Sequence, residues 1–206
     1  MPLVRRDIAK PAAAPAGADE AVARGALRSA DPDMRWNAAR ALGADPASVA
    51  ALATALETEP VARVREAIMT ALMRIGNQES VKALLPYLRE QDAAKRGAAI
   101  EALQALPDAT APFLSALLHD ADSDVRILAV ELVRGMPAAE ATRLLCDILE
   151  HEPHPNVCAS AVDALAEVGT RDALPALEHC ARRFADTPFL PFAVSIAITR
   201  ISNGKG

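Results

Sequence analysis

The chain has 206 residues, of which 51% are hydrophobic and only 3% aromatic, and its formal net charge is −5. The apolar residues are mostly Ala, Leu and Val, which suits closely packed helices better than a pocket lined by rings. Because an acidic chain lacks the basic surface of a nucleic-acid binder or a membrane-surface helix, we expect neither nucleic acid nor membrane as a partner.

The first 18 residues are rich in Pro and Ala and contain no continuous apolar stretch of signal-peptide length. No segment of the chain reaches the ~18 consecutive apolar residues that a spanning helix needs. The three cysteines are an odd, sparse set, which favours a reducing compartment over a disulfide framework. We therefore predict a disordered tail over residues 1–18 in a cytoplasmic protein.

A repeated pattern follows the tail. A lone helix is predicted over residues 19–29, and an Arg then returns at positions 35, 65, 96 and 126. Small or apolar residues stand three, six and seven positions after each Arg, which is the spacing of one face of an amphipathic helix. A period in the range of roughly 20–50 residues is typical of stacked structural repeats.

Each repeat continues with a turn and a second helix. The turns are marked by residues that end helices or cannot continue them, namely Gly43, Gly76, Pro107, Pro137 and Gly169. A fifth repeat and a final helix over 188–202 complete the pattern. The sequence predicts an all-α protein, a right-handed α-α superhelix of about five helix pairs plus end helices, over residues 19–202.

Acidic residues precede most of the repeated arginines. Their side chains can accept the free N–H groups of a first helical turn, and their charge can offset an Arg placed near the positive end of a helix. We therefore expect a structural ladder of Arg/Asp pairs, in which only Arg65 lacks acids and reaches a neighbouring repeat. The ladder comprises Arg35 with Asp31 and Asp33, Arg96 with Asp92, Arg126 with Asp122 and Asp124, and Arg65.

The pattern D-x-D-V-R-x-x-A-x-x-A-L resembles HEAT repeats, most closely the subtype named for phycobilisome lyases. The resemblance covers residues 19–201 and implies the solenoid fold. Its implication for function is broad, because the family includes scaffolds, assembly factors, chromophore lyases and regulators.

The fifth repeat departs from the pattern. His154 stands where other copies have Asp, and Cys158 stands where they have Arg. Together with Cys146 and His151 they give C-x4-H-x2-H-x3-C, and thiolates and imidazoles at such spacings can bind zinc. The alternative, which we favour, is a neutral substitution in which Cys158 is a small buried residue, so no metal site is assigned.

No catalytic motif is evident. The sequence has no P-loop, dinucleotide-type glycine loop, nucleophile elbow or H-E-x-x-H pair. His179 precedes Cys180, but adjacent residues on a helix point about 100° apart, so this His does not face the thiol. We predict no catalytic residue, no cofactor and no enzymatic activity.

Two apolar features allow two interpretations each. Trp36, the only Trp, is either an exposed binding anchor or a packing residue. The apolar run over 189–198 either covers the last helix pair with one side or makes a dimer or partner contact.

The second helices of a solenoid line its concave face. Aligned positions on the second helices become polar and acidic towards the fourth and fifth repeats. Our main interpretation is therefore a non-catalytic scaffold, adaptor or regulatory subunit that binds another protein. The acidic end of the face favours a basic segment of that partner. The predicted partner-binding residues are Tyr87, Glu90, His119, Asp147, Glu150, Glu178, His179 and Arg182.

The alternative, from the enzyme class, is a bilin lyase-like chromophore-attachment protein or subunit, as the name of the repeat subtype implies. A bilin groove would be expected to hold aromatic and polar residues, and the chain has one Tyr. A third interpretation, a DNA-repair solenoid, requires a basic groove and ranks last for this acidic chain. The sequence leaves the oligomeric state open.

Overall fold

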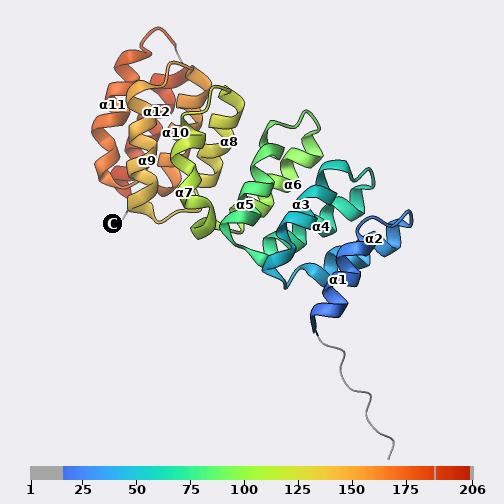
Figure 1. Cartoon of the computed structure of the whole chain (residues 1–206). Coiled ribbons are helices and arrows are strands. Elements are labelled where there is room, and N and C mark those ends of the chain that lie inside the picture. Colours follow the sequence, from blue (N-terminus) through green and yellow to red (C-terminus); the bar gives the residue numbers. More distant parts are fainter. Residues whose placement is uncertain (1–15, 188, 205–206) are drawn as a thin grey trace, which may run out of the picture. The chain divides into compact units, whose positions relative to one another are not determined.

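A computed structural model of the chain describes residues 16–187 and 189–204, and these residues form twelve α-helices with three short 3₁₀ segments and no strand (Figure 1). The predicted tail over 1–18 falls mainly on residues 1–15, which lie outside the described residues, and α1 begins at Ala16. Contacts divide the chain into two units, with the division after Ile75. Each unit is described by itself.

Unit 1 contains four α-helices. Helix α2 packs against both α1 and α4, and α3 packs against α4. Their bounds are α1 Ala16–Ala26, α2 Pro32–Leu42, α3 Val49–Thr58, after the 3₁₀ turn Pro46–Ser48, and α4 Ala62–Ile75.

Unit 2 contains the remaining eight helices as successive hairpins. Helix α8 packs against α7 and α10, α10 packs against α9 and α12, and α12 also packs against α11. Their bounds are α5 Gln78–Leu84, with the 3₁₀ helix η2 Leu85–Arg89, α6 Ala93–Gln104, α7 Pro107–Leu118, α8 Ser123–Val133, α9 Ala138–His151, α10 Pro155–Val168, α11 Leu174–Arg183, after η3 Arg171–Ala173, and α12 Phe189–Asn203.

Small residues at fixed helical spacing let the first helices of the repeats pack closely. Ala99, Ala129 and Ala161, three residues beyond the repeated position, are each completely buried. Leu103 and Leu165, four residues further along their helices, are also completely buried. This apolar stripe is the one that the sequence predicts, and it forms the centre of the core because each helix can cover it only with its neighbours.

Local signals fix where the first helices begin. The side chains of Asp31, Asp92 and Asp122 each accept a hydrogen bond from a backbone N–H of the first turn of α2, α6 and α8. Helices α2 and α10 also carry a Pro in the first turn, where its missing N–H costs nothing. The predicted capping signals at these three aspartates are therefore present.

The two apolar features are placed as follows. Trp36 is half-buried, with the Arg40 guanidinium of the same helix 4.5 Å from its ring centroid, so part of the ring is covered and part remains open to a partner. On α12, Leu190 and Val194 face inwards, whereas Phe192 on the other side is 67% exposed. No helix of the described residues is both long and apolar enough to cross a membrane.

Two glycines should respond to alanine in opposite directions. Gly76 follows α4 with φ of 65°, a left-handed conformation that strains any residue with a Cβ. Gly97 lies inside α6, where an added Cβ would meet nothing within 4 Å. We expect Gly76→Ala to lower the free energy of unfolding by about 1 kcal/mol and Gly97→Ala to raise it by about 0.5–1 kcal/mol. Urea denaturation of both variants checks this, and a shift of the same sign in both would contradict it.

Candidate functional site

Two of the repeated arginines hold the loops between repeats in the same way. Arg35 Nε and Nη2 donate to the two carboxylate oxygens of Glu59 at 2.7 and 2.8 Å, and Nη1 donates to the carbonyls of Ser29 and Ala30 at 2.8 and 3.1 Å. Each guanidinium thus binds one carboxylate in a bidentate fashion and closes the preceding loop.

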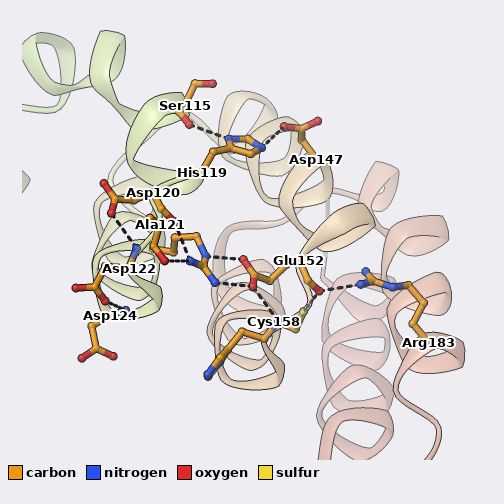
Figure 2. Close-up of polar contacts among 12 residues, drawn as sticks. Ser115, His119, Asp120, Ala121, Asp122, Asp124, Asp147, Glu152, Cys158 and Arg183 are labelled. Carbon is orange, nitrogen blue, oxygen red and sulfur yellow. Dashed lines mark hydrogen bonds and ion pairs between the residues drawn. The ribbon is translucent and has the colours of Figure 1, made fainter.

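Arg126 repeats this geometry in unit 2 (Figure 2). It donates to Glu152 at 2.7 and 2.8 Å and to the carbonyls of Asp120 and Ala121 at 2.8 and 3.2 Å. The side chain of Glu152, like that of Glu59, is only 3% exposed. These two buried glutamates were not among the predicted residues, although each lies just beyond a second helix, two dozen residues after its Arg.

The predicted Arg/Asp pairing therefore differs from the observed one. Asp31, Asp92 and Asp122 cap helices, and among the described residues Asp31 and Asp122 form no ion pair with Arg35 or Arg126, whose carboxylate partners are Glu59 and Glu152. Asp33 pairs with Arg63 of the next repeat, and Asp124 is exposed in the first turn of α8. The physical reason is that the short Asp side chain folds back onto its own helix start, whereas the longer guanidinium extends to the glutamate and the loop carbonyls.

Arg65 and Arg96 retain half of this arrangement. Arg65 Nη1 donates to the carbonyls of Glu59 and Pro60 at 3.3 and 2.8 Å, and Arg96 Nη1 donates to the Glu90 carbonyl at 2.6 Å. Closing a loop through its carbonyls is thus the role that all four arginines share.

In the fifth repeat, residues other than the repeated Arg bind the loop carbonyls. Cys158 donates its thiol hydrogen to the Glu152 carbonyl at 3.4 Å. Arg183, from α11, donates to the carbonyls of Leu149, Glu150 and Glu152 at 2.6, 3.0 and 2.8 Å. Figure 2 shows the bond to Glu152. Arg183 therefore supplies from another helix the guanidinium that position 158 lacks.

The structure gives the candidate zinc residues no common centre. Among the described residues, no group of three or more His, Cys, Asp or Glu side chains is placed to hold a metal ion. Cys158 is completely buried, His151 is exposed, and His154 caps α10 without a side-chain hydrogen bond. Burial, with Glu150 and Asp172 nearby, raises the pKa of the half-buried Cys146 to about 11, so this thiol stays protonated and unreactive at neutral pH.

The predicted partner-binding residues fall into two groups. Tyr87 is a correction, because it is only 7% exposed. It lies in η2, whose three residues per turn shift the side-chain faces relative to an α-helix. Glu90 ends η2, is half-buried and lies 3.8 Å from Lys95.

The other six predicted residues are exposed on α7, α9 and α11. His119 lies with Nε2 3.7 Å from Asp147, and Glu178 lies 4.0 Å from Arg182 on the same helix. A shallow hollow of about 440 Å³ on α9 contains Asp147, Glu150 and Asp172. Apart from this acidic hollow, the six residues share no site; they are His119, Asp147, Glu150, Glu178, His179 and Arg182.

The largest described hollow lies in unit 1, where the sequence did not predict a site. It measures about 660 Å³ and carries three arginines but one carboxylate, that of Glu59. Its apolar wall is formed by aliphatic residues and contains no aromatic ring. We call it the unit 1 pocket, and it is lined by Arg24, Gly25, Leu27, Arg28, Ser29, Arg35, Ala51, Thr54, Ala55, Thr58, Glu59 and Pro60.

Only one of the three arginines is free to bind an anion. Arg35 is held by Glu59, and Arg24 donates to Asp45 at 3.1 Å. The Ser48 hydroxyl hydrogen bond lowers the pKa of Asp45, so this carboxylate remains charged and keeps Arg24 neutralised. Arg28 is exposed, and its guanidinium has no hydrogen bond or ion pair with any described residue.

The matching place in unit 2 shows why Arg28 is unusual. His119 stands seven residues before Arg126, as Arg28 stands before Arg35, and His119 faces a carboxylate, Asp147. The wall opposite Arg28 carries Thr54 and Ala55, which bear no charge. An uncompensated guanidinium above an aliphatic wall is suited to a ligand that is apolar along its length and bears carboxylates.

Comparison with known proteins settles the family. A family model of HEAT repeats matches residues 20–104 and 110–187, which is most of the chain. The chain is a HEAT-repeat protein. Its all-helical, HEAT/armadillo-like solenoid class is the one that the sequence predicts. The fold is similar to that of the archaeal HEAT-like repeat protein from Thermococcus onnurineus NA1. The two are 14% identical with a TM-score of 0.52, and the match covers 90% of this chain and 88% of that one.

This HEAT-repeat protein is related to bilin biosynthesis proteins, as the repeat subtype implies. PecE from Nostoc sp. is 43% identical over 75 residues, which is 35% of this chain and 30% of that protein. PecE from Mastigocladus laminosus is 32% identical over 149 residues, 70% of this chain and 55% of that protein. The chain thus spans about half or less of these relatives.

A solved complex is also similar to the HEAT-repeat chain. It is the complex of CpcE and CpcF of phycocyanin lyase from Nostoc sp. PCC7120, at 20% identity and a TM-score of 0.40, covering 97% of this chain and 100% of that chain.

These relatives correct two predictions. The interpretation as a non-catalytic scaffold or adaptor is wrong, because both PecE relatives are named for bilin biosynthesis, which agrees with the alternative of a bilin lyase-like protein. The prediction of no enzymatic activity is wrong on the same finding. The HEAT pattern reports how helices pack, and it carries no information on the chemistry of the surface.

The Arg35–Glu59 pair gives a pH-dependent prediction. The Arg35 hydrogen bond lowers the pKa of Glu59 from its ordinary value of 4.5, against the opposing effect of burial. A carboxylate with a depressed pKa stabilises the fold above its unfolded-state pKa and loses that effect as pH falls through the folded-state pKa. We expect Glu59→Gln to lower the free energy of unfolding by about 2 kcal/mol at pH 7 and the difference to shrink steadily below pH 4.5.

Urea denaturation of this variant between neutral and acidic pH measures the effect. The exposed Glu57, in the last turn of the preceding helix α3, provides a control, and Glu57→Gln should leave stability unchanged throughout. A Glu59→Gln difference that persisted undiminished at low pH would count against the ion pair.

Proposed function

We propose that this HEAT-repeat protein is a bilin lyase-like chromophore-attachment protein or subunit, which holds a linear tetrapyrrole in the unit 1 pocket. The single observation that carries the proposal is the unpaired Arg28 above an aliphatic wall, in a chain related to bilin biosynthesis proteins. A bilin is a chain of four pyrrole rings with two propionate carboxylates, so it combines the apolar length and the negative charges that this pocket suits.

Different residues of the unit 1 pocket bind different parts of the ligand. Arg28 donates charge-assisted hydrogen bonds to a propionate, because no carboxylate of the described residues competes for its guanidinium. Leu27, Ala51 and Ala55 pack against the pyrrole rings, in place of the aromatic residues that a bilin groove would be expected to have. The Arg35–Glu59 pair keeps the loop beneath the ligand in one conformation.

Biliverdin, a linear tetrapyrrole diacid, tests the pocket directly. We expect the protein to bind it with a shifted absorption band, and Arg28→Ala to weaken binding by roughly tenfold, which corresponds to the loss of one charge-assisted hydrogen bond. Arg74→Ala removes an exposed arginine of the same unit outside the pocket and should change nothing. The dimethyl ester of biliverdin should bind wild type and Arg28→Ala alike.

Absorbance titration gives the Kd of each combination. Failure of the wild type to bind biliverdin would reject the bilin proposal. Equal binding of the diacid by wild type and Arg28→Ala would reject the assignment of the propionate to Arg28.

Chromophore attachment requires an acceptor protein, and the acidic face of unit 2 supports a docking place for it. Asp147, Glu150 and Glu178 are exposed on α9 and α11, and a basic segment of the acceptor complements their charge. The predicted cytoplasmic location agrees with such a partnership and stays a prediction.

Charge reversal tests the acceptor site. We expect Asp147→Lys, Glu150→Lys and Glu178→Lys together to abolish recovery of the main protein partner by affinity purification from the native organism, because each replaces attraction by repulsion. The matched control reverses the same number of exposed acids elsewhere in unit 2, at Glu101, Asp108 and Glu140. Mass spectrometry identifies the partner, and unchanged recovery with the first variant would reject the acidic face.

A further inference from the structure

The outer side of α12 carries an apolar stripe. Phe189, Phe192 and Ile196 are 47%, 67% and 42% exposed, and they are three of the five large hydrophobic side chains that are exposed among the described residues. Their spacing of three and four residues places them on one face of the helix, opposite the buried Leu190 and Val194. An apolar surface of this kind on a folded protein is typical of an interaction site. We call these three residues the α12 stripe.

The repeat itself does not require apolar residues at these positions. The buried Val194 of α12 corresponds to the buried Ala161 of α10, 33 residues earlier. Phe189 and Ile196 then fall on positions that are polar in the two preceding first helices. Those positions hold Asn156 and Asp163 in α10, and Asp124 and Glu131 in α8. Because the earlier repeats pack with polar side chains there, the α12 stripe serves a contact outside the fold of the chain.

The surroundings of the stripe favour a partner surface that is also apolar. Ser195 Oγ donates to the Phe192 carbonyl at 2.7 Å, and Thr199 Oγ1 donates to the Ser195 carbonyl at 2.8 Å. Since these bonds lie within one helix, a partner can cover both hydroxyls without the loss of a hydrogen bond. Helix α12 contains no acidic residue and one basic residue, Arg200. A strongly charged partner would therefore find no complementary charge along the stripe.

One charge of each sign lies beyond the two ends of the stripe. Asp186 lies three residues before Phe189, in the turn that precedes α12, and Arg200 lies four residues after Ile196. Both charged side chains are exposed, and neither has a hydrogen bond or ion pair with any described residue. A surface with an apolar middle, a negative end and a positive end complements an antiparallel copy of itself.

We propose that the α12 stripe is the contact between two copies of this chain, which pair antiparallel about a twofold axis near Phe192. Phe189 of each copy packs against Ile196 of the other, and the two Phe192 rings meet at the axis. Asp186 of each copy lies beside Arg200 of the other and forms an ion pair at the rim. Two facing helices bury less than the roughly 1,200 Å² of a stable interface, so we expect a weak dimer with a Kd of about 10 µM. This inference is independent of the proposed function.

Sedimentation velocity of the 206-residue chain tests the dimer over roughly 1–200 µM, a range that brackets this Kd. We expect a shift from monomer to dimer with concentration. Phe192→Glu should weaken the dimer roughly a hundredfold, because the substitution enters a twofold interface twice. As a control, Val22→Glu places the same charge on α1 at a side chain that is 72% exposed, and it should leave dimerisation unchanged. A chain that stays monomeric would assign the stripe to another partner and overturn the proposal, as would a dimer that Phe192→Glu leaves intact.

Charge reversal tests the antiparallel register without a change in the stripe itself. Asp186→Arg and Arg200→Asp should each weaken self-association roughly tenfold, because each places like charges together at both ends of the interface. An equimolar mixture of the two variants should recover the wild-type dimer, since the mixed dimer places an arginine beside an aspartate at each end. Circular dichroism checks that both variants keep their helices. A mixture that associates no better than either variant alone would overturn the antiparallel arrangement.

Discussion

Helices α2 to α12 each carry apolar residues that a helix cannot bury alone, and this constraint determines the rest of the structure. The stripe contains alanine at the same turn in successive repeats, so that neighbouring helices approach closely and the leucines beside them are completely buried. The requirement is met only by another helix of the same kind. Stability is therefore built up between neighbours, and the outward face of each helix remains free of packing demands.

Close packing of the hairpins leaves polar backbone groups without partners in the loops between them. Loop carbonyls at these corners have no helical partner, and they lie at the edge of a dry core. The repeated guanidinium meets this need, and in the Arg35 and Arg126 copies a buried glutamate fixes its position. The fifth repeat shows that the need persists when the Arg is lost, because Arg183 reaches the same carbonyls from α11. Each repeat thus provides a donor to its loop carbonyls, although the residue that provides it differs in the fifth repeat.

Function arises where the outward face departs from this regular plan. In unit 1, Arg28 borders a hollow with an aliphatic wall, and its guanidinium has no carboxylate partner among the described residues. The corresponding residue in unit 2, His119, lies beside the carboxylate of Asp147. Two side-chain differences between the units, Arg28 for His119 and Ala55 for Asp147, thus change the charge of the surface while the helical arrangement of the repeat stays the same. A repeat fold can in this way combine a hollow with an unpaired arginine in one unit and an acidic surface in the other.

The sequence by itself determined the helix order, the turns, the caps at Asp31, Asp92 and Asp122, and the family, because these depend on local periodicity and on hydrogen bonds within one helical turn. It did not determine the partners of the arginines, the burial of Tyr87 or the unit 1 pocket. Those depend on side chains two dozen residues apart that meet only when hairpins stack, and on a 3₁₀ turn that moves a ring from one face to the other.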